Sequence, residues 1–100
     1  MLKQIMYDIE NDKSRTKIAK YLEQTGLTRL QYSLFIGKMN FVKWQKTKQK
    51  IEKIFNQYAS PNDKLYIQNI DENNFEKMEI MGNAPDIDFI LHKQKVLYIG

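Results

Sequence analysis

The feature that most constrains the fold of this chain is its first stretch, residues 2–8, which is predicted to be a short strand ending on a single acid, Asp8. Aromatic and branched side chains favour a strand over a helix in a segment of this length. A polar turn follows, and a predicted helix then begins with a cluster of cations: Lys13, Arg15, Lys17 and Lys20. An acid that faces cations is a poor element of a core. We interpret it as suited to holding a metal beside a phosphate backbone.

Apolar residues at helical spacing predict two helices. The first covers roughly residues 12–25, with Asn11 or Asp12 as its N-cap and Gly26 at its end. The second opens near Asn40 and runs to about residue 58. Its apolar stripe holds Trp44, Thr47, Ile51, Ile54, Phe55 and Tyr58, and its other face carries lysines.

The clearest predicted strand is residues 29–36, because apolar and mostly polar side chains alternate along it and Gly37 breaks it. The apolar face carries Leu30, Tyr32, Leu34 and Ile36. The more polar face carries Arg29 and Phe35 and is available for a ligand or a second subunit. Further strands are predicted at residues 64–70 and 75–81. The remaining residues, 87–99, are predicted to form a strand-forming tail with a turn at residues 92–95.

These elements favour an α+β fold, a ferredoxin-like sandwich in which two helices cover one face of an antiparallel sheet. A single domain, residues 1–100, is expected, since one hundred residues bury one modest core. The small sheet has open edges, and pairing with a second copy would cover them, so a homodimer is expected.

Composition narrows the class of protein. The chain has 42% hydrophobic residues and no cysteine, which suits an ordinary globular protein in a reducing cytosol. No apolar run is long enough to span a bilayer, and Lys3, Gln4 and Asp8 interrupt any signal-peptide core. We therefore expect a cytoplasmic protein without a membrane partner.

The net charge of +4 is spread unevenly along the chain. Residues 1–60 hold 12 Lys and Arg against 5 Asp and Glu, whereas residues 61–100 hold 4 against 7. Such a basic region is expected for a polyanion partner such as nucleic acid. The alternative is that these lysines are solvated helix faces.

The first third of the chain also resembles a known family. The motif residues that carry the resemblance begin with Tyr7-Asp8-Ile9, continue through Asp12-Lys13, Arg15, Lys17-Ile18-Ala19-Lys20 and Leu22, and end with Gly26-Leu27, Arg29, Gln31 and Ser33-Leu34-Phe35. This joint spacing is similar to that of the CRISPR-associated Cas2 family, the small nucleases that partner the Cas1 integrase. Residues 75–82 and the tail resemble the family less specifically.

The resemblance implies a homodimer whose C-terminal strands add to the partner's sheet. It implies a divalent metal, usually Mg²⁺, between the two Asp8 carboxylates of the dimer. Tyr7, Arg15, Arg29 and Phe35 fall on family positions linked to nuclease activity, and Lys17 falls where some members carry a second arginine. Lysine keeps that charge but loses the bidentate fork of arginine.

The residues taken alone leave plainer readings open. Asp8 would be a turn acid, Tyr7 and Phe35 core residues, and Arg29 a surface cation; His92 is interpreted as solvated. With the resemblance, Mg²⁺ suits oxygen ligands and could activate water, while the two arginines clamp phosphates.

Three functions therefore compete. The first is a metal-dependent endonuclease acting on RNA or DNA in spacer acquisition. The second is a scaffold that bridges integrase dimers and holds spacer DNA through Arg15, Lys17, Lys20, Arg29 and the lysines of the second helix. The third is a stand-alone ribonuclease toxin. A generic RNA-recognition sheet is weaker, because Phe35 is the one stacking aromatic expected on the exposed face.

Overall fold

The computed structural model describes residues 1–91, so the predicted turn at 92–95 and strand at 96–99 lie outside the described residues. In chain order its elements are β1 (Leu2–Asp8), α1 (Asp12–Gln24), β2 (Thr28–Gln31), β3 (Leu34–Lys38), α2 (Phe41–Tyr58), β4 (Lys64–Ile70), α3 (Glu72–Glu76) and α4 (Ile87–Leu91). No helix among residues 1–91 is long and apolar enough to cross a membrane.

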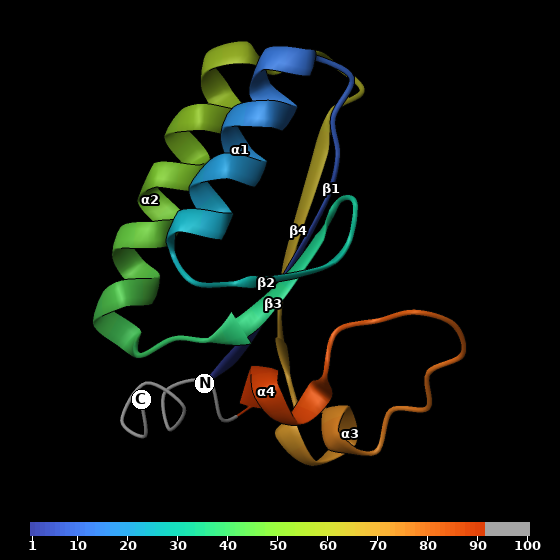
Figure 1. Ribbon diagram of the computed structural model, residues 1–100. Helices are drawn as coiled ribbons and strands as arrows, with labels where there is room; N and C mark the ends of the chain where they lie inside the picture. Colours follow the sequence, from blue (N-terminus) through green and yellow to red (C-terminus); the bar gives the residue numbers. More distant parts are fainter. Residues whose placement is uncertain (92–100) are drawn as a thin grey trace.

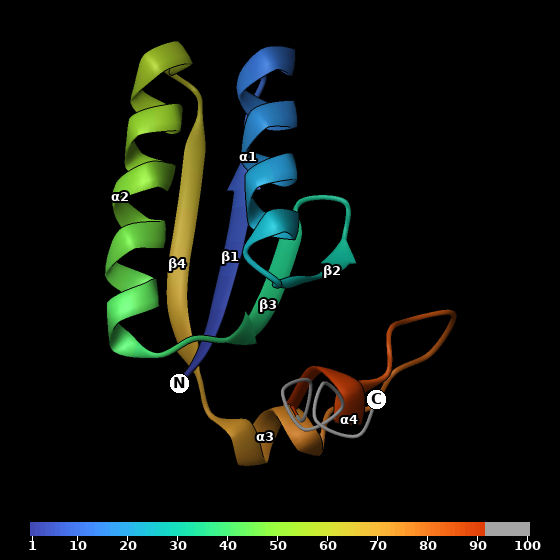
Figure 2. The same ribbon diagram turned by 60° about the vertical axis from the view of Figure 1, so that its left-hand side comes forward.

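The four strands form one antiparallel sheet in the order β2-β3-β1-β4. β1 is central: it pairs with β4 along its whole length, from Leu2 opposite Ile70 to Asp8 opposite Lys64. Helices α1 and α2 lie side by side across one face (Figures 1 and 2). The order of elements and the layers confirm the predicted ferredoxin-like sandwich.

The main core lies between the sheet and these two helices. Side chains alternate along β1, so Ile5 and Tyr7 face the helices, where they meet Ile18 and Leu22 of α1 and Ile51 of α2, all buried. Asn11 and Asn40 cap the helices by accepting hydrogen bonds from the backbone N–H groups of Ser14 and Lys43. Both predicted helices are confirmed almost to the residue.

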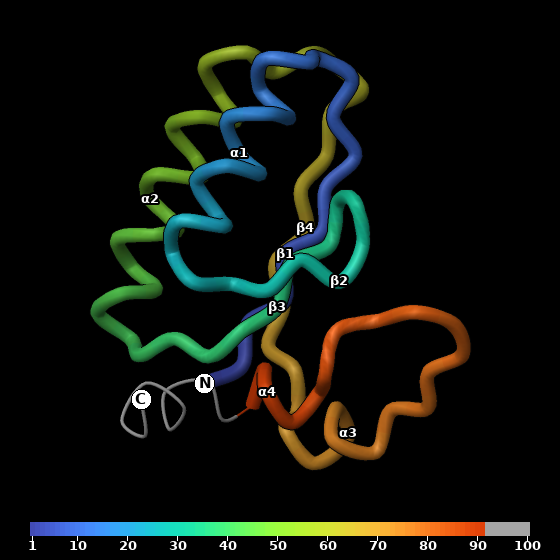
Figure 3. Tube along the Cα trace, viewed as in Figure 1, coloured from blue at the N-terminus to red at the C-terminus, as the bar shows by residue number. Residues whose placement is uncertain are grey.

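A smaller cluster covers one end of the opposite face. It contains Leu2 of β1 and Ile36 of β3, which pack against Phe75, Ile90 and Leu91 of the short helices. The trace in Figure 3 shows α3 and α4 at this end of the sheet, away from the layer of α1 and α2.

The predicted strand at 29–36 is wrong as a single element. It is a hairpin: β2 ends at Gln31, Tyr32 and Ser33 form the turn, and β3 begins at Leu34. Gly37 does not break a strand but lies inside β3, where a Cβ atom would sit 2.8 Å from Leu27 Cδ2. Glycine permits this close approach of the loop that precedes β2.

The predicted strand at 75–81 is also wrong. Asp71 accepts a hydrogen bond from the Asn73 N–H, 2.8 Å away, and starts α3, which buries Phe75. The apolar residues that suggested a strand, among them Met78, Ile80 and Met81, are exposed and form no regular element. Residues 87–91, predicted as part of a strand-forming tail, form α4, which buries Ile90 and Leu91.

Candidate functional site

Asp8 is the last residue of β1, and its side chain is exposed. Because neighbouring side chains point to opposite faces of a strand, Asp8 lies on the face away from α1 and α2, whereas Tyr7 faces them. Within residues 1–91, no hydrogen bond or ion pair engages its carboxylate. The carboxylate is therefore available to an outside partner.

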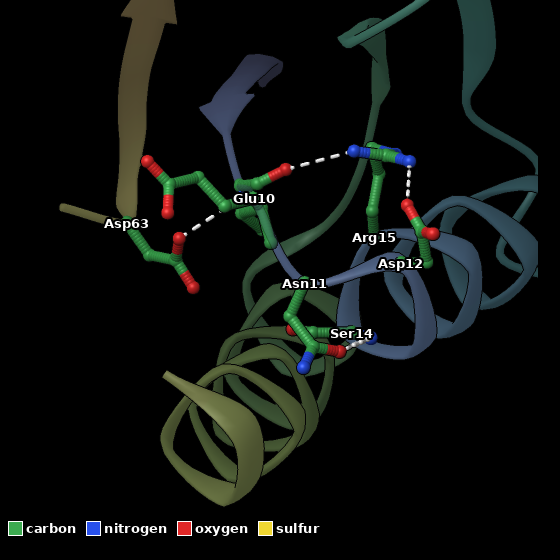
Figure 4. Close-up of polar contacts among 7 residues, drawn as sticks. Glu10, Asn11, Asp12, Ser14, Arg15 and Asp63 are labelled. Carbon is green, nitrogen blue, oxygen red and sulfur yellow. Dashed lines mark hydrogen bonds and ion pairs between the residues drawn. The ribbon is translucent and has the colours of Figure 1, made fainter. Parts of the chain in front are cut away.

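The turn after Asp8 is held from both sides (Figure 4). The Glu10 N–H donates to Asp63 Oδ1 at 2.9 Å, and Arg15 Nη1 donates to the Ile9 carbonyl oxygen at 3.1 Å. Arg15 also pairs with Asp12 through Nη2. Backbone donors from Glu10 and Ser60 lower the pKa of Asp63, which keeps this anchor ionised. The end of β1, and Asp8 with it, is thereby fixed relative to α1 and β4.

Tyr7, Arg29 and Phe35 come together beside the β2–β3 turn. The Tyr7 and Phe35 rings stack with centroids 6.3 Å apart, and Arg29 Cζ lies 5.2 Å from the Phe35 ring. Arg29 Nε donates to the Tyr32 carbonyl oxygen at 2.9 Å, and Nη1 pairs with Glu23 Oε1 at 3.1 Å. These contacts hold the Arg29 guanidinium in one orientation.

Burial raises the pKa of the Tyr7 hydroxyl above its ordinary value, although the nearby Arg29 and Arg15 act to lower it. Tyr7 is therefore neutral at physiological pH. Its hydroxyl lies 3.5 Å from the Tyr32 carbonyl oxygen, so it supports the turn and is not poised as a base.

We expect the Tyr7 pKa to be visible in both titration and stability. The unfolded chain ionises Tyr7 near its ordinary pKa of about 10, so above that pH the unfolded state binds fewer protons and stability falls as pH rises through the folded pKa. The difference between the ultraviolet titration curves of the wild type and of Tyr7→Phe isolates the ionisation of Tyr7. We expect this ionisation above pH 10. A Tyr7 pKa at or below 10 contradicts this assignment.

A cavity of about 260 Å³ lies between α1 and the β2–β3 turn. Three cations line it, Arg15, Lys20 and Arg29, together with Glu23 and the ring of Tyr32. The structure thus brings three of the four predicted nucleic-acid-binding residues to one place. Lys17 lies apart, in the groove between α1 and α2, where its Nζ donates to Tyr58 Oη at 3.0 Å.

Two aromatic residues exchange the roles that the sequence suggested. Phe35 was expected on an exposed face but is 0% exposed, in contact with the core. Tyr32, expected on the apolar face of a continuous strand, is 72% exposed and lines the cavity. Sequence reasoning missed Tyr32 because no Gly, Pro, Asn or Asp marks the turn at Tyr32 and Ser33.

The fit of a divalent metal is partial in one chain. Mg²⁺ takes oxygen ligands and keeps several waters, and the unengaged Asp8 carboxylate suits it. However, among residues 1–91 no group of three or more His, Cys, Asp or Glu side chains forms a metal site. The residues fit Mg²⁺ only if a second chain or a substrate phosphate supplies further oxygens.

Fold and site together define a small ferredoxin-like α+β protein with one free acid at the end of its first strand and a cationic cavity between α1 and the β2–β3 turn. A family model described as CRISPR associated protein Cas2 matches residues 1–78, and the chain belongs to this family. The family suggested by the motifs is confirmed.

Individual relatives agree. The chain is 52% identical over 40 residues to the CRISPR-associated endoribonuclease Cas2 1 of Archaeoglobus fulgidus, a match that covers 40% of this chain and 43% of the relative. The match thus spans less than half the length of that relative.

The chain is also 32% identical over 81 residues to a CRISPR-associated endoribonuclease Cas2 of a Synechocystis strain, a match that covers 81% of this chain and 84% of the relative. The crystal structure of Streptococcus pyogenes Cas2 superposes with a TM-score of 0.67 at 20% identity, over 82% of this chain and 100% of that one, which shows the shared fold.

Proposed function

We propose that this protein is a metal-dependent endoribonuclease of the CRISPR spacer-acquisition machinery, active as a homodimer. The observation that carries the proposal is the exposed Asp8 carboxylate, fixed at the end of β1 and engaged by no partner within residues 1–91. The curated relatives are named endoribonucleases, which supports the reaction type.

The number of metal ligands supports a homodimer. One carboxylate leaves the rest of the Mg²⁺ coordination to water and substrate phosphate, whereas a two-fold axis close to Asp8 would supply a second carboxylate and a firmer site. The open face of the sheet near Asp8 carries the exposed apolar side chains Met6 and Tyr66, which a second copy would cover. In the adaptation complex, such a dimer would bridge Cas1 integrase dimers.

The residues then divide the work. Asp8 from each chain would hold Mg²⁺, which when bound supplies a Lewis acid for the phosphoryl group. Arg15 and Arg29 bind neighbouring phosphates through guanidinium groups that are already oriented. Tyr7 and Phe35 support Arg29 from the core, so their family positions are explained by positioning and not by contact with the scissile bond.

The proposal is tested by incubating labelled single-stranded RNA with purified dimer and Mg²⁺, with and without EDTA. We expect cleavage that EDTA stops and that depends on Asp8. Cleavage that persists in EDTA contradicts the metal-dependent reaction, and a monomer that cuts as fast as the dimer contradicts the shared site.

A second function, binding of duplex DNA as a scaffold, is favoured by a separate observation. The groove between α1 and α2 has a volume of about 290 Å³ and is lined by four lysines: Lys17, Lys20, Lys50 and Lys53. Among the described residues, no carboxylate lines it. Unpaired cations attract phosphates without reading sequence. This surface lies on the layer of α1 and α2, which covers one face of the sheet (Figure 2). By the alternation along β1, the Asp8 side chain lies on the other face.

Removing two of these charges with Lys50→Gln and Lys53→Gln together should weaken duplex binding and make it less sensitive to salt. Each lost phosphate contact lowers the slope of log affinity against log salt by about 0.9, so the pair should lower it by about 2. Fluorescence anisotropy over a salt series measures the slope. Lys46→Gln with Lys48→Gln removes the same charge from the same helix outside the groove; an equal effect of both pairs would show that only net charge matters.

A further inference from the structure

The cavity between α1 and the β2–β3 turn combines charge with an exposed aromatic ring. Arg15 and Lys20 come from α1, and Arg29 and Tyr32 come from the hairpin. Glu23 is the one carboxylate among the described residues that line it, and it is paired with Arg29. The lining therefore keeps an excess of positive charge.

The two guanidinium groups are oriented before any ligand arrives. Arg15 donates to the Ile9 carbonyl oxygen and to Asp12, and Arg29 donates to the Tyr32 carbonyl oxygen and to Glu23. A guanidinium has five N–H donors, so donors remain on both groups even with the Tyr7 hydroxyl near Arg29. Oriented donors with spare N–H groups bind a phosphate at little entropic cost.

Tyr32 gives this cavity a second kind of contact. One face of its ring lies against Arg29, with Cζ 4.8 Å from the centroid, and 72% of the residue is exposed. An exposed ring backed by a guanidinium is a platform on which a base can stack, and sites for single strands combine such platforms with cations. Bases inside a duplex already stack on each other and cannot use it.

We propose that this cavity is a subsite for one unpaired nucleotide, whose base stacks on Tyr32 while its phosphate contacts Arg15 and Lys20. The inference rests on the proposed function for its ligand class, since it assumes that this protein binds nucleic acid. It adds a residue, Tyr32, and a preference for single strands. In this proposal Tyr32 of the β2–β3 turn, and not Phe35, is the aromatic residue on which a base stacks.

The test measures binding and not cleavage, so it does not depend on an active metal site. Dimer carrying Asp8→Asn is titrated by fluorescence anisotropy into four labelled probes: oligouridylate, oligothymidylate of the same length, the RNA with abasic positions, and a duplex. Each is compared with the same protein carrying Tyr32→Ala, Tyr32→Phe or Lys20→Gln. Phe41→Ala, which removes a 65% exposed aromatic outside the cavity, is the matched control.

We expect Tyr32→Ala to weaken binding of the base-bearing single strands about tenfold and to leave the abasic and duplex probes unchanged. Tyr32→Phe should bind as before, and Lys20→Gln should weaken the normal and abasic strands alike. An equal loss on RNA and DNA assigns the site to any unpaired nucleotide, and a loss on RNA alone adds recognition of the sugar.

The inference is overturned if Tyr32→Ala binds oligouridylate as tightly as the parent, or if it loses as much on the abasic strand. It is also overturned if Phe41→Ala has the same effect. Thermal melting of every variant excludes unfolding, and unchanged binding of the abasic and duplex probes shows that a Tyr32→Ala protein with a lowered melting temperature is still folded in the assay. Cleavage by the wild type is measured separately. If Tyr32→Ala weakens binding as expected but the wild type does not cleave RNA, the nucleotide subsite is supported and only the proposed nuclease activity is contradicted.

Discussion

Replacing Asp8 with asparagine is expected to lower metal-dependent RNA cleavage by more than about a hundredfold while leaving the dimer folded. A metal ligand carries several kcal/mol of transition-state stabilisation, and each 1.4 kcal/mol is about tenfold in rate. Asparagine keeps the shape of the side chain but removes the charge that would hold Mg²⁺ in the proposed site. Because Asp8 is exposed and its carboxylate has no partner within residues 1–91, the free energy of unfolding should change by about 0.5 kcal/mol or less.

The measurement is single-turnover cleavage of labelled RNA over a series of Mg²⁺ concentrations, with the dimer confirmed by light scattering. Glu10→Gln is the matched control. Glu10 is exposed and lies two residues after Asp8, and the substitution also removes one negative charge. Equal loss in both variants would mean that only local charge matters. If Asp8→Asn cuts as well as wild type, Asp8 is not the metal ligand. If no protein cuts and all bind duplex DNA equally, the scaffold function stands instead.

Periodic segments were predictable because their pattern and their caps agree. α1 and α2 combine an apolar stripe with an Asn at the cap position, and β1 and β4 have the predicted bounds. In each, the local preference and the burial in the fold favour the same structure. The family motif lies largely on these elements and on the hairpin.

The hairpin was not predictable, and it decides the geometry of the site. In one continuous strand, Arg29 and Phe35 would lie about 20 Å apart, at 3.3 Å per residue. In the hairpin they are cross-strand partners, and Arg29 Cζ lies 5.2 Å from the Phe35 ring. The alternation of apolar residues continues through the turn at Tyr32 and Ser33, and Ser33 alone is a weak turn signal, so pattern alone extends the strand.

Alternation also misled the interpretation of residues 75–81, for a different reason. Met78 and Ile80 are spaced as in a strand, yet both are exposed, and the buried residue of this region is Phe75 in α3. Periodicity predicts a strand only when one face is buried, and a single sequence does not say which face that is. The proposed metal site is beyond a single sequence for a related reason, because its second carboxylate would belong to another copy.

Replacing Phe35 with alanine is expected to cost about 3–5 kcal/mol of stability, the largest structural effect of any predicted site residue. Phe35 is 0% exposed, stacks on Tyr7 and packs in the main core. Small domains have only about 5–15 kcal/mol of stability, so loss of nuclease activity in Phe35→Ala would largely report unfolding. Urea denaturation followed by circular dichroism measures the cost.

Phe35→Leu separates packing from catalysis, because leucine keeps an apolar side chain at the site and is expected to cost roughly 1–2 kcal/mol. Assayed well below its melting temperature, it should keep cleavage within about tenfold of wild type, with the loss arising from a less firmly supported Arg29. Phe75→Leu, in the other buried cluster, is the control: a similar loss of stability without any effect on cleavage. A folded Phe35→Leu protein that loses cleavage as completely as Asp8→Asn would show that the ring contacts the substrate, and the buried, supporting role assigned to Phe35 would be wrong.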